Sequence, residues 1–232
     1  MKRERFTTFL EHADISFKME DINIVRGDRG SGKRLVFNML RRSIKPKTGK
    51  VLLDNLDLYD YSEKTFKNHI NYCASHPSFI SGTIKENLML VSKRFDAVRK
   101  ACEKVGVLQT IEALPDGFNC QIIDVTSSET LFLIGLARAL LTNPCILMIY
   151  ELPQDVSEEF IYSFRKIIKK LENQTTVIFF THSTAFDDIA GLVYVVENGE
   201  VKVVQNGQSV QEESVSKPKK STPKKKKVET KK

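Results

Sequence analysis

Short apolar runs recur along the chain, and each has the length of a buried β-strand. Several of them are apolar on both faces, which is typical of strands in a parallel sheet that is covered by helices on two sides. Two valine-rich runs flank the pair Asn198-Gly199, which is a strong signal for a β-hairpin turn. The predicted strands cover residues 22–26, 51–53, 70–74, 146–149, 176–180, 193–196 and 201–204.

Segments with helical spacing of apolar residues alternate with these strands. Leu35, Met39 and Leu40 share one face of a helix that follows the first strand, and residues 131–141 and 160–171 form further helices. The alternation predicts an α/β fold with a mostly parallel sheet. Between residues 83 and about 113 the apolar residues also fall on one helical face, so the block from about 77 to 143 is predicted to be a helical insertion: Leu88, Leu90, Phe95, Val98, Ala101 and Val105.

The composition changes abruptly after Gln205. The formal net charge of the whole chain is +7, but residues 217–232 contain nine lysines and one glutamate, so the rest of the chain is nearly neutral. A polar segment rich in Lys, Pro, Ser and Thr cannot bury enough apolar surface to offset its ordering entropy. We therefore expect one domain over residues 1–205 and a disordered Lys-rich tail over residues 206–232 that contacts anionic surfaces.

Several classes of protein are not indicated by the sequence. No apolar run approaches the roughly 20 residues that span a bilayer, so we expect any membrane association to depend on a partner. Residues 1–11 are charged and lack the apolar stretch of a secretory signal. The four cysteines have no paired spacing, and Cys145 opens an apolar run, where we expect a buried thiol. These features favour a reducing, cytoplasmic setting.

A glycine-rich segment, GDRGSGK at residues 27–33, follows the first predicted strand and opens a helix. A phosphate-binding loop requires this context, because the glycines let backbone N–H groups converge on phosphate oxygens at a helix N-terminus. Lys33 would supply the cation for the β- and γ-phosphates. The alternative is a glycine-rich turn without a ligand. A working P-loop has Ser or Thr at the next position to bind Mg²⁺, and this chain has Arg34.

Further motifs follow this loop in a fixed order: PSFISGTIKENL at 77–88, LPDGF at 114–118, ARALL at 137–141, an apolar strand ending in Glu151, and Thr181-His182. Over about residues 10–205 this order resembles the ATP-binding cassette (ABC) family, in particular the nucleotide-binding domains of exporter-type transporters. The resemblance implies a P-loop NTPase fold of ABC type, with an inserted helical subdomain and ATP as the ligand. The strand that carries the adenine-stacking aromatic in the family would precede residue 1. Phe6 or Phe9 could replace that aromatic or could belong to the core.

Three departures from the family pattern concern the positions that handle Mg²⁺. In the family these are the Ser or Thr after the P-loop lysine, a glutamine, and the Walker B aspartate, and here they are Arg34, Ser75 and Tyr150. Mg²⁺ prefers oxygen ligands in near-octahedral order, and only the Ser75 hydroxyl remains. The resemblance therefore implies ATP binding with a compromised Mg²⁺ site. Arg34 either approaches the phosphates and partly neutralises them or points to solvent.

The signature motif of the family falls on residues 126–130, which read TSSET. In the family this loop caps the γ-phosphate bound to a partner domain. Glu129 replaces a glycine and brings a negative charge toward the phosphate, unless it turns outward as a surface acid near a helix start. The altered Mg²⁺ positions and Glu129 would each weaken the closure of a head-to-tail dimer around nucleotide. This holds for a dimer with a second copy of the chain and for a dimer with an intact partner.

Two catalytic positions of the family are retained, Glu151 for the carboxylate that polarises water and His182 for the histidine that contacts the γ-phosphate. The alternatives are a surface acid and a hydrogen-bonded histidine at two strand ends. The signature position comprises Ser127, Ser128 and Glu129. The residues expected to bind nucleotide are Gly27, Asp28, Arg29, Gly30, Ser31, Gly32, Lys33, Arg34, Leu35 and Ser75.

Three functions are consistent with these residues. The first is an exporter-like ABC domain that binds nucleotide with impaired or absent hydrolysis, on a transmembrane subunit or domain at the cytoplasmic face of a membrane. The second is a catalytically dead scaffold, and the third is a soluble ABC protein that contacts nucleic acid through its basic tail. The segment 77–88 favours the first, because it resembles exporters that dock on transmembrane helices.

Overall fold

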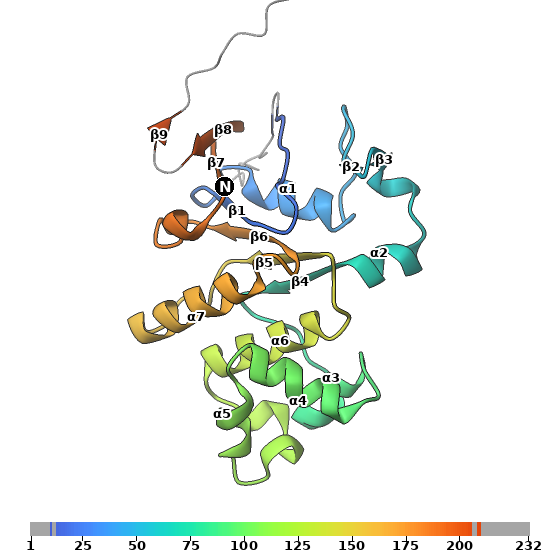
Figure 1. Cartoon of the computed structure of the whole chain (residues 1–232), viewed down its shortest axis with the longest axis vertical. Coiled ribbons are helices and arrows are strands. Elements are labelled where there is room, and N and C mark those ends of the chain that lie inside the picture. The colour runs from blue at the N-terminus through green and yellow to red at the C-terminus, as the bar shows by residue number, and fades with distance from the viewer. Residues whose placement is uncertain (1–9, 11–12, 206–207, 210–232) are drawn as a thin grey trace, which may run out of the picture.

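The computed structural model describes residue 10, residues 13–205 and residues 208–209. Within these residues the central feature is a seven-stranded sheet (Figure 1). In their order across the sheet, the strands are β4 (Ile70–Ala74), β5 (Ile146–Tyr150), β6 (Thr176–Thr181), β1 (Ile22–Arg26), β7 (Leu192–Glu197), β8 (Glu200–Gln205) and β9 (Gln208–Ser209). Neighbours from β4 to β7 pair in parallel, and β8 and β9 pair antiparallel. The predicted mostly parallel α/β sheet is therefore confirmed.

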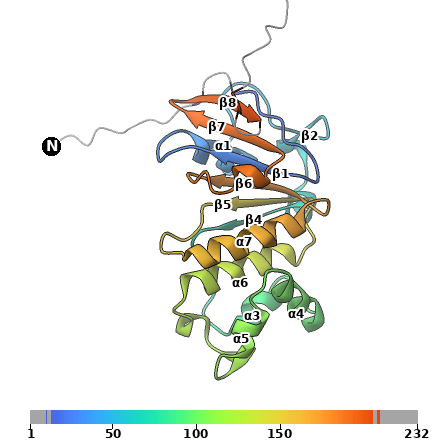
Figure 2. The same cartoon turned by 60° about the vertical axis from the view of Figure 1, so that its left-hand side comes forward.

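Helices cover both faces of this sheet, as Figure 2 shows. The helices of the described residues are α1 (Lys33–Leu40), α2 (Glu63–His69), α3 (Ile84–Met89), α4 (Phe95–Lys104), α5 (Leu108–Glu112), α6 (Ser128–Leu140) and α7 (Glu158–Leu171). Short 3₁₀ turns lie at Leu58–Asp60, Gly117–Asn119, Ile122–Asp124 and Asp187–Ile189. None of the helices in the described part of the chain has the length and apolar character of a membrane span.

Alternate residues of the strands divide the interior into two cores. Ile24 and Phe179 belong to one core, together with Phe132 of α6 and Phe164 of α7. Their chain neighbours, such as Phe180, belong to the other core, with residues of α1. This division follows from the pleat, because successive strand side chains point to opposite faces. The sheet is therefore apolar on both sides, as its sequence predicts.

The predicted helical insertion is built from separate short helices. Between residues 84 and 112 the chain forms α3, α4 and α5, and Gly106, with φ of 75°, follows the end of α4. Glycine adopts this left-handed conformation without steric cost, so it suits a helix end. Figure 1 shows α3, α4 and α5 gathered below the sheet and beside α6.

Three local expectations have different outcomes. The hairpin at Asn198-Gly199 is confirmed, with φ of 51° and 84° at the two turn residues. The run at 51–53 contributes β2 (Leu52–Leu53), which pairs with β3 (Leu56–Asp57) in a separate two-stranded sheet. The expectation for Cys145 is wrong, because its side chain is exposed and its Sγ lies 3.3 Å from His69 Nδ1.

Apart from β9, the predicted Lys-rich tail at 206–232 lies outside the described residues, and so do Phe6 and Phe9.

Candidate functional site

The glycine-rich turn between β1 and α1 folds as a compact loop. A Cβ atom added to Gly27 would lie 2.5 Å from both Ser31 Oγ and the Val196 carbonyl oxygen, so only glycine fits there. Gly30 and Gly32 have φ of 87° and 112°, in the left-handed region. The Gly27 N–H donates to the Thr181 carbonyl oxygen at 3.1 Å, which ties the loop to the end of β6.

Other loop residues complete the cradle. Ser31 is buried and its N–H donates to the Asp28 carbonyl oxygen at 3.2 Å, while Asp28 and Arg29 are exposed. The half-buried Leu35 donates its N–H to Gly32 at 2.8 Å and so belongs to the first turn of α1. This arrangement presents a helix N-terminus and a glycine-rich backbone, which is a fit for a phosphate group.

Lys33 is the first residue of α1, and its side chain is only 4% exposed. Its ammonium donates to the Gly27 carbonyl oxygen at 2.6 Å and forms an ion pair with Glu151 Oε1 at 2.7 Å. The lysine therefore lies folded over the turn that would hold the phosphates, and its charge is neutralised by a carboxylate from the end of another strand.

Glu151 follows β5 in a left-handed backbone conformation, with φ of 55°. Its N–H donates to the Phe180 carbonyl oxygen at 2.8 Å, which holds the residue against β6. Its second carboxylate oxygen, Oε2, lies 2.8 Å from His182 Nδ1. The structure thus brings together three residues that the sequence pattern assigns to one site. Glu151 lies between the other two and contacts both Lys33 and His182. The His182 side chain is 69% exposed, so this chain of contacts runs from the buried lysine to the surface.

The ring of Tyr150, the residue that the sequence pattern assigns to the Walker B aspartate position, packs in an aromatic cluster. The ring centroid lies 4.7 Å from that of Phe37 on α1 and 6.0 Å from that of Phe180 on β6. Burial raises the pKa of the Tyr150 phenol, the Glu151 charge raises it further, and the exposed Arg34 lowers it. The hydroxyl therefore stays protonated at neutral pH and supplies no anionic ligand.

The side chains at the three metal positions do not fit Mg²⁺. Arg34 is a cation, and Tyr150 is packed against phenylalanines. The Ser75 hydroxyl lies 3.1 Å from His76 Nδ1, and both carboxylate oxygens of Glu151 are engaged as described above. Among the described residues there is also no cluster of three or more His, Cys, Asp or Glu side chains that could hold a metal ion. These three positions supply no carboxylate or amide oxygen for octahedral coordination, so a Mg²⁺ ion here would rely on hydroxyl, phosphate and water oxygens.

The signature segment lies at the start of α6. Ser127 caps this helix by accepting the Thr130 N–H at 3.2 Å, and Ser128 is its first residue. Glu129 Oε1 accepts the N–H of Ser157 at 2.7 Å and its hydroxyl at 3.0 Å. Glu129 is thus tied to the N-terminus of α7 within the same chain. In the described structure, no hydrogen bond or ion pair connects it to the Lys33 site.

Two groups of residues around these positions were not predicted from the sequence. Ser157 was not singled out, although a Ser followed by two Glu residues is typical of a helix N-terminus. Phe37 was not singled out either, and Phe180 was predicted only as the end of the strand 176–180. Nothing in the one-dimensional pattern shows that the three rings meet, because their contact depends on how α1 lies across the sheet.

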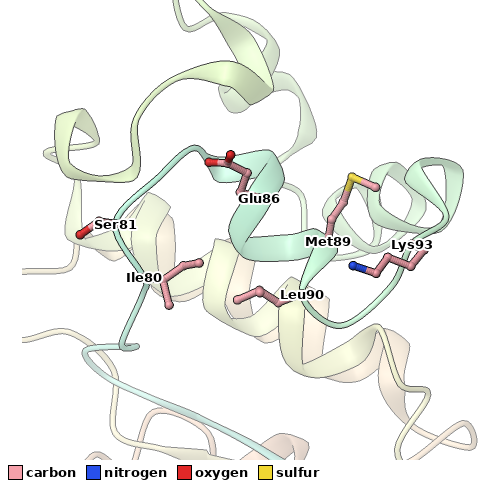
Figure 3. A pocket seen from close by; sticks show the side chains of 6 residues that line it. All are labelled: Ile80, Ser81, Glu86, Met89, Leu90 and Lys93. Carbon is pink, nitrogen blue, oxygen red and sulfur yellow. The ribbon is translucent and has the colours of Figure 1, made fainter.

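A separate cavity of about 360 Å³ lies beside the segment that precedes α3. Figure 3 shows Ile80 and Leu90 beside it, and these two apolar side chains are 50% and 56% exposed. Exposed apolar side chains around a hollow are typical of a contact surface. The residues that line it are Ile80, Ser81, Glu86, Met89, Leu90 and Lys93.

The family model described as ABC transporter matches residues 10–152. A protein of Mycoplasma pneumoniae that is named an ABC transporter ATP-binding protein (MG015 homolog) is 29% identical over 200 residues, which cover 83% of this chain and 31% of that protein. YheH of Bacillus subtilis, named a multidrug resistance ABC transporter ATP-binding/permease protein, is 27% identical over 83% of this chain and 29% of its own length. The chain therefore spans about a third of the length of these relatives.

Replacing Tyr150 by Asp, which would restore the family residue, is expected to destabilise the fold. The change removes a ring from the cluster with Phe37 and Phe180 and places a carboxylate against their buried surfaces, at a cost of about 2–4 kcal/mol. Chemical denaturation measures this difference. The matched control Tyr150→Phe keeps the ring, and we expect it to stay within about 0.5 kcal/mol of wild type. Equal stability of the Asp and Phe variants would contradict the packing role.

Glu129 and Ser157 are expected to be energetically coupled. Hydrogen bonds to a charged carboxylate contribute about 1.5–3 kcal/mol when well formed, and partial exposure reduces this to about 1 kcal/mol. A double-mutant cycle of Glu129→Ala and Ser157→Ala, followed by thermal unfolding, measures the coupling. The cycle isolates the bond from the Ser157 hydroxyl, because the Ser157 N–H is kept in Ser157→Ala. Strictly additive effects would show that this side-chain hydrogen bond contributes nothing to stability.

Proposed function

The chain belongs to the ABC transporter family, and from this premise we propose that it is an ATP-binding domain in which hydrolysis is impaired or absent. The match over residues 10–152 and the compact loop around Lys33 support the binding of ATP phosphates. Glu151 and His182 occupy the catalytic positions of the family pattern, and the other nucleotide-binding positions are those of the loop, Arg34, Leu35 and Ser75. The protein therefore acts through nucleotide occupancy rather than through rapid turnover.

The observation that carries this proposal is the position of Tyr150. Its ring packs against Phe37 and Phe180 at the strand end where the family has its aspartate. Arg34 adds a positive charge on the first turn of α1, and a cation there repels a divalent metal ion. Phosphoryl transfer relies on metal ions that bridge the β- and γ-phosphates and neutralise developing charge. A site without metal ligands can bind polyphosphate through Lys33. It still lacks the charge neutralisation by metal ions that phosphoryl transfer needs.

We propose that the partner is a transmembrane subunit or domain, with this chain at the cytoplasmic face of the membrane. The printed name of YheH combines ATP-binding and permease functions, and the chain matches only 29% of that relative. The cavity beside Ile80 and Leu90, with its exposed apolar rim, supports a protein contact at this surface (Figure 3). The Lys-rich tail is an additional candidate for contact with anionic lipid.

A second nucleotide-binding domain is also part of the proposal, as a weakly closing partner. Glu129 takes the place of a signature glycine, so its side chain prevents the close backbone approach that glycine allows, while its carboxylate is held by Ser157 within the chain. This supports weak closure of both homodimers and heterodimers around nucleotide.

A catalytically dead scaffold that binds no nucleotide is the second candidate. It is favoured by the ion pair of Lys33 with Glu151, since the lysine already has a counter-ion. Nucleotide titration separates the two candidates.

We expect ADP and ATP to bind with similar affinity in EDTA and in Mg²⁺, because the positions of the metal ligands are occupied by Arg34 and Tyr150. Isothermal titration calorimetry under the two conditions measures this. A gain of about tenfold or more in affinity with Mg²⁺ would mean that the protein contacts the metal, which contradicts the proposal.

Lys33→Ala is expected to abolish nucleotide binding, because it removes the cation from the phosphate loop. Circular dichroism checks that the variant is folded, and Lys47→Ala, at an exposed lysine beyond α1, serves as the matched control. Unchanged affinity in Lys33→Ala would place the nucleotide elsewhere on the protein and remove the basis of the proposed function.

A further inference from the structure

The ammonium of Lys33 makes two contacts in the phosphate loop. It donates to the Gly27 carbonyl oxygen at 2.6 Å and pairs with Glu151 Oε1 at 2.7 Å. An ammonium has three N–H donors, so these two contacts leave one free. The side chain is 4% exposed, and Glu151 supplies its only carboxylate partner among the described residues. A phosphate that needs this lysine must therefore compete with Glu151.

The Glu151 backbone is held against β6, and its carboxylate contacts a residue on each side. Its backbone N–H donates to the Phe180 carbonyl oxygen, and its left-handed φ of 55° is uncommon for a residue with a side chain. The second carboxylate oxygen is bound by His182 Nδ1 at 2.8 Å. The neighbouring Tyr150 is a neutral phenol, so no adjacent aspartate can share the lysine. Within the described part of the chain, Glu151 is therefore the only acid that neutralises Lys33.

We propose that Glu151 acts as an internal competitor of phosphate, an autoinhibitory carboxylate that covers the P-loop lysine until a polyphosphate displaces it. This inference rests on the proposed function and adds a regulatory contact to the same site. A bound phosphate close to the Glu151 carboxylate would be a like-charge neighbour, which disfavours binding. His182 lies at the surface with its side chain 69% exposed, and it offers the displaced carboxylate a partner away from the loop.

The contact predicts selectivity for the phosphate part of the nucleotide. The lysine of a P-loop reaches the β- and γ-phosphates, so the competition concerns ligands that carry a diphosphate or triphosphate. Adenosine does not need Lys33, and its binding is therefore independent of Glu151.

The test compares wild type with Glu151→Gln by calorimetric titration of ADP and of inorganic pyrophosphate in EDTA. Glutamine has nearly the same shape but no charge, so it releases the lysine. We expect affinity for both ligands to rise by about tenfold or more, with no change for adenosine. ADP is the product of ATP hydrolysis, so a gain with ADP does not come from blocked turnover. Glu103→Gln, at an exposed acid on α4, is the matched control and should leave affinity unchanged.

Each outcome decides the proposal. Equal or weaker ADP binding by folded Glu151→Gln, with wild type binding measurably, overturns the competitor role and leaves the proposed function intact. Binding by neither protein overturns both. Binding by the variant alone supports both. If Glu151→Gln does not fold, Glu151→Ala replaces it with the same expected gain. If neither variant folds, Glu151 is a structural residue that phosphate cannot displace, and the proposal is wrong.

Discussion

The ion pair between the Lys33 ammonium and the Glu151 carboxylate connects the ends of two elements that are far apart in sequence. Lys33 opens α1 after β1, and Glu151 follows β5, with β6 between the two strands. Parallel strands end at the same edge of a sheet, and ligands of α/β proteins bind at this edge. The glycine-rich loop, the exposed His182 and the aromatic cluster around Tyr150 all lie about this contact. The loop can therefore attract a polyphosphate, although the Lys33 ammonium already forms an ion pair with the Glu151 carboxylate.

The same strand ends account for what the site lacks. At the end of β5 the sequence places an aromatic ring before the carboxylate, and the ring stabilises the packing of α1 on the sheet. The Tyr150 ring thus lies at the position where the family pattern has an aspartate that serves the metal ion. Binding of phosphate depends on the loop backbone and on Lys33, which remain, whereas phosphoryl transfer also depends on a metal ion. The two capacities are separable, and we infer that this chain keeps the first and has lost most of the second.

Local sequence patterns predicted the parts of the site that lie at strand ends. The P-loop, Glu151 and His182 are each adjacent to an apolar run, so the parallel topology brings them together. The bond between Glu129 and Ser157 joins two helices across 28 positions, and no periodicity indicates it. The contact of Tyr150 with Phe37 depends on the crossing of α1 over the sheet. Cys145 reads as core because an apolar strand follows it, yet it precedes β5 and is exposed.

We infer that nucleotide occupies the site without efficient hydrolysis. A single-turnover experiment tests it most directly, with the protein in excess over ATP, Mg²⁺ present and the release of inorganic phosphate followed over time. We expect release at or only slightly above the buffer level, with little difference between wild type and Glu151→Gln. Phosphate release that is well above the buffer level in wild type and is abolished by Glu151→Gln would contradict it, because Glu151 would then serve as a catalytic base in a working ATPase.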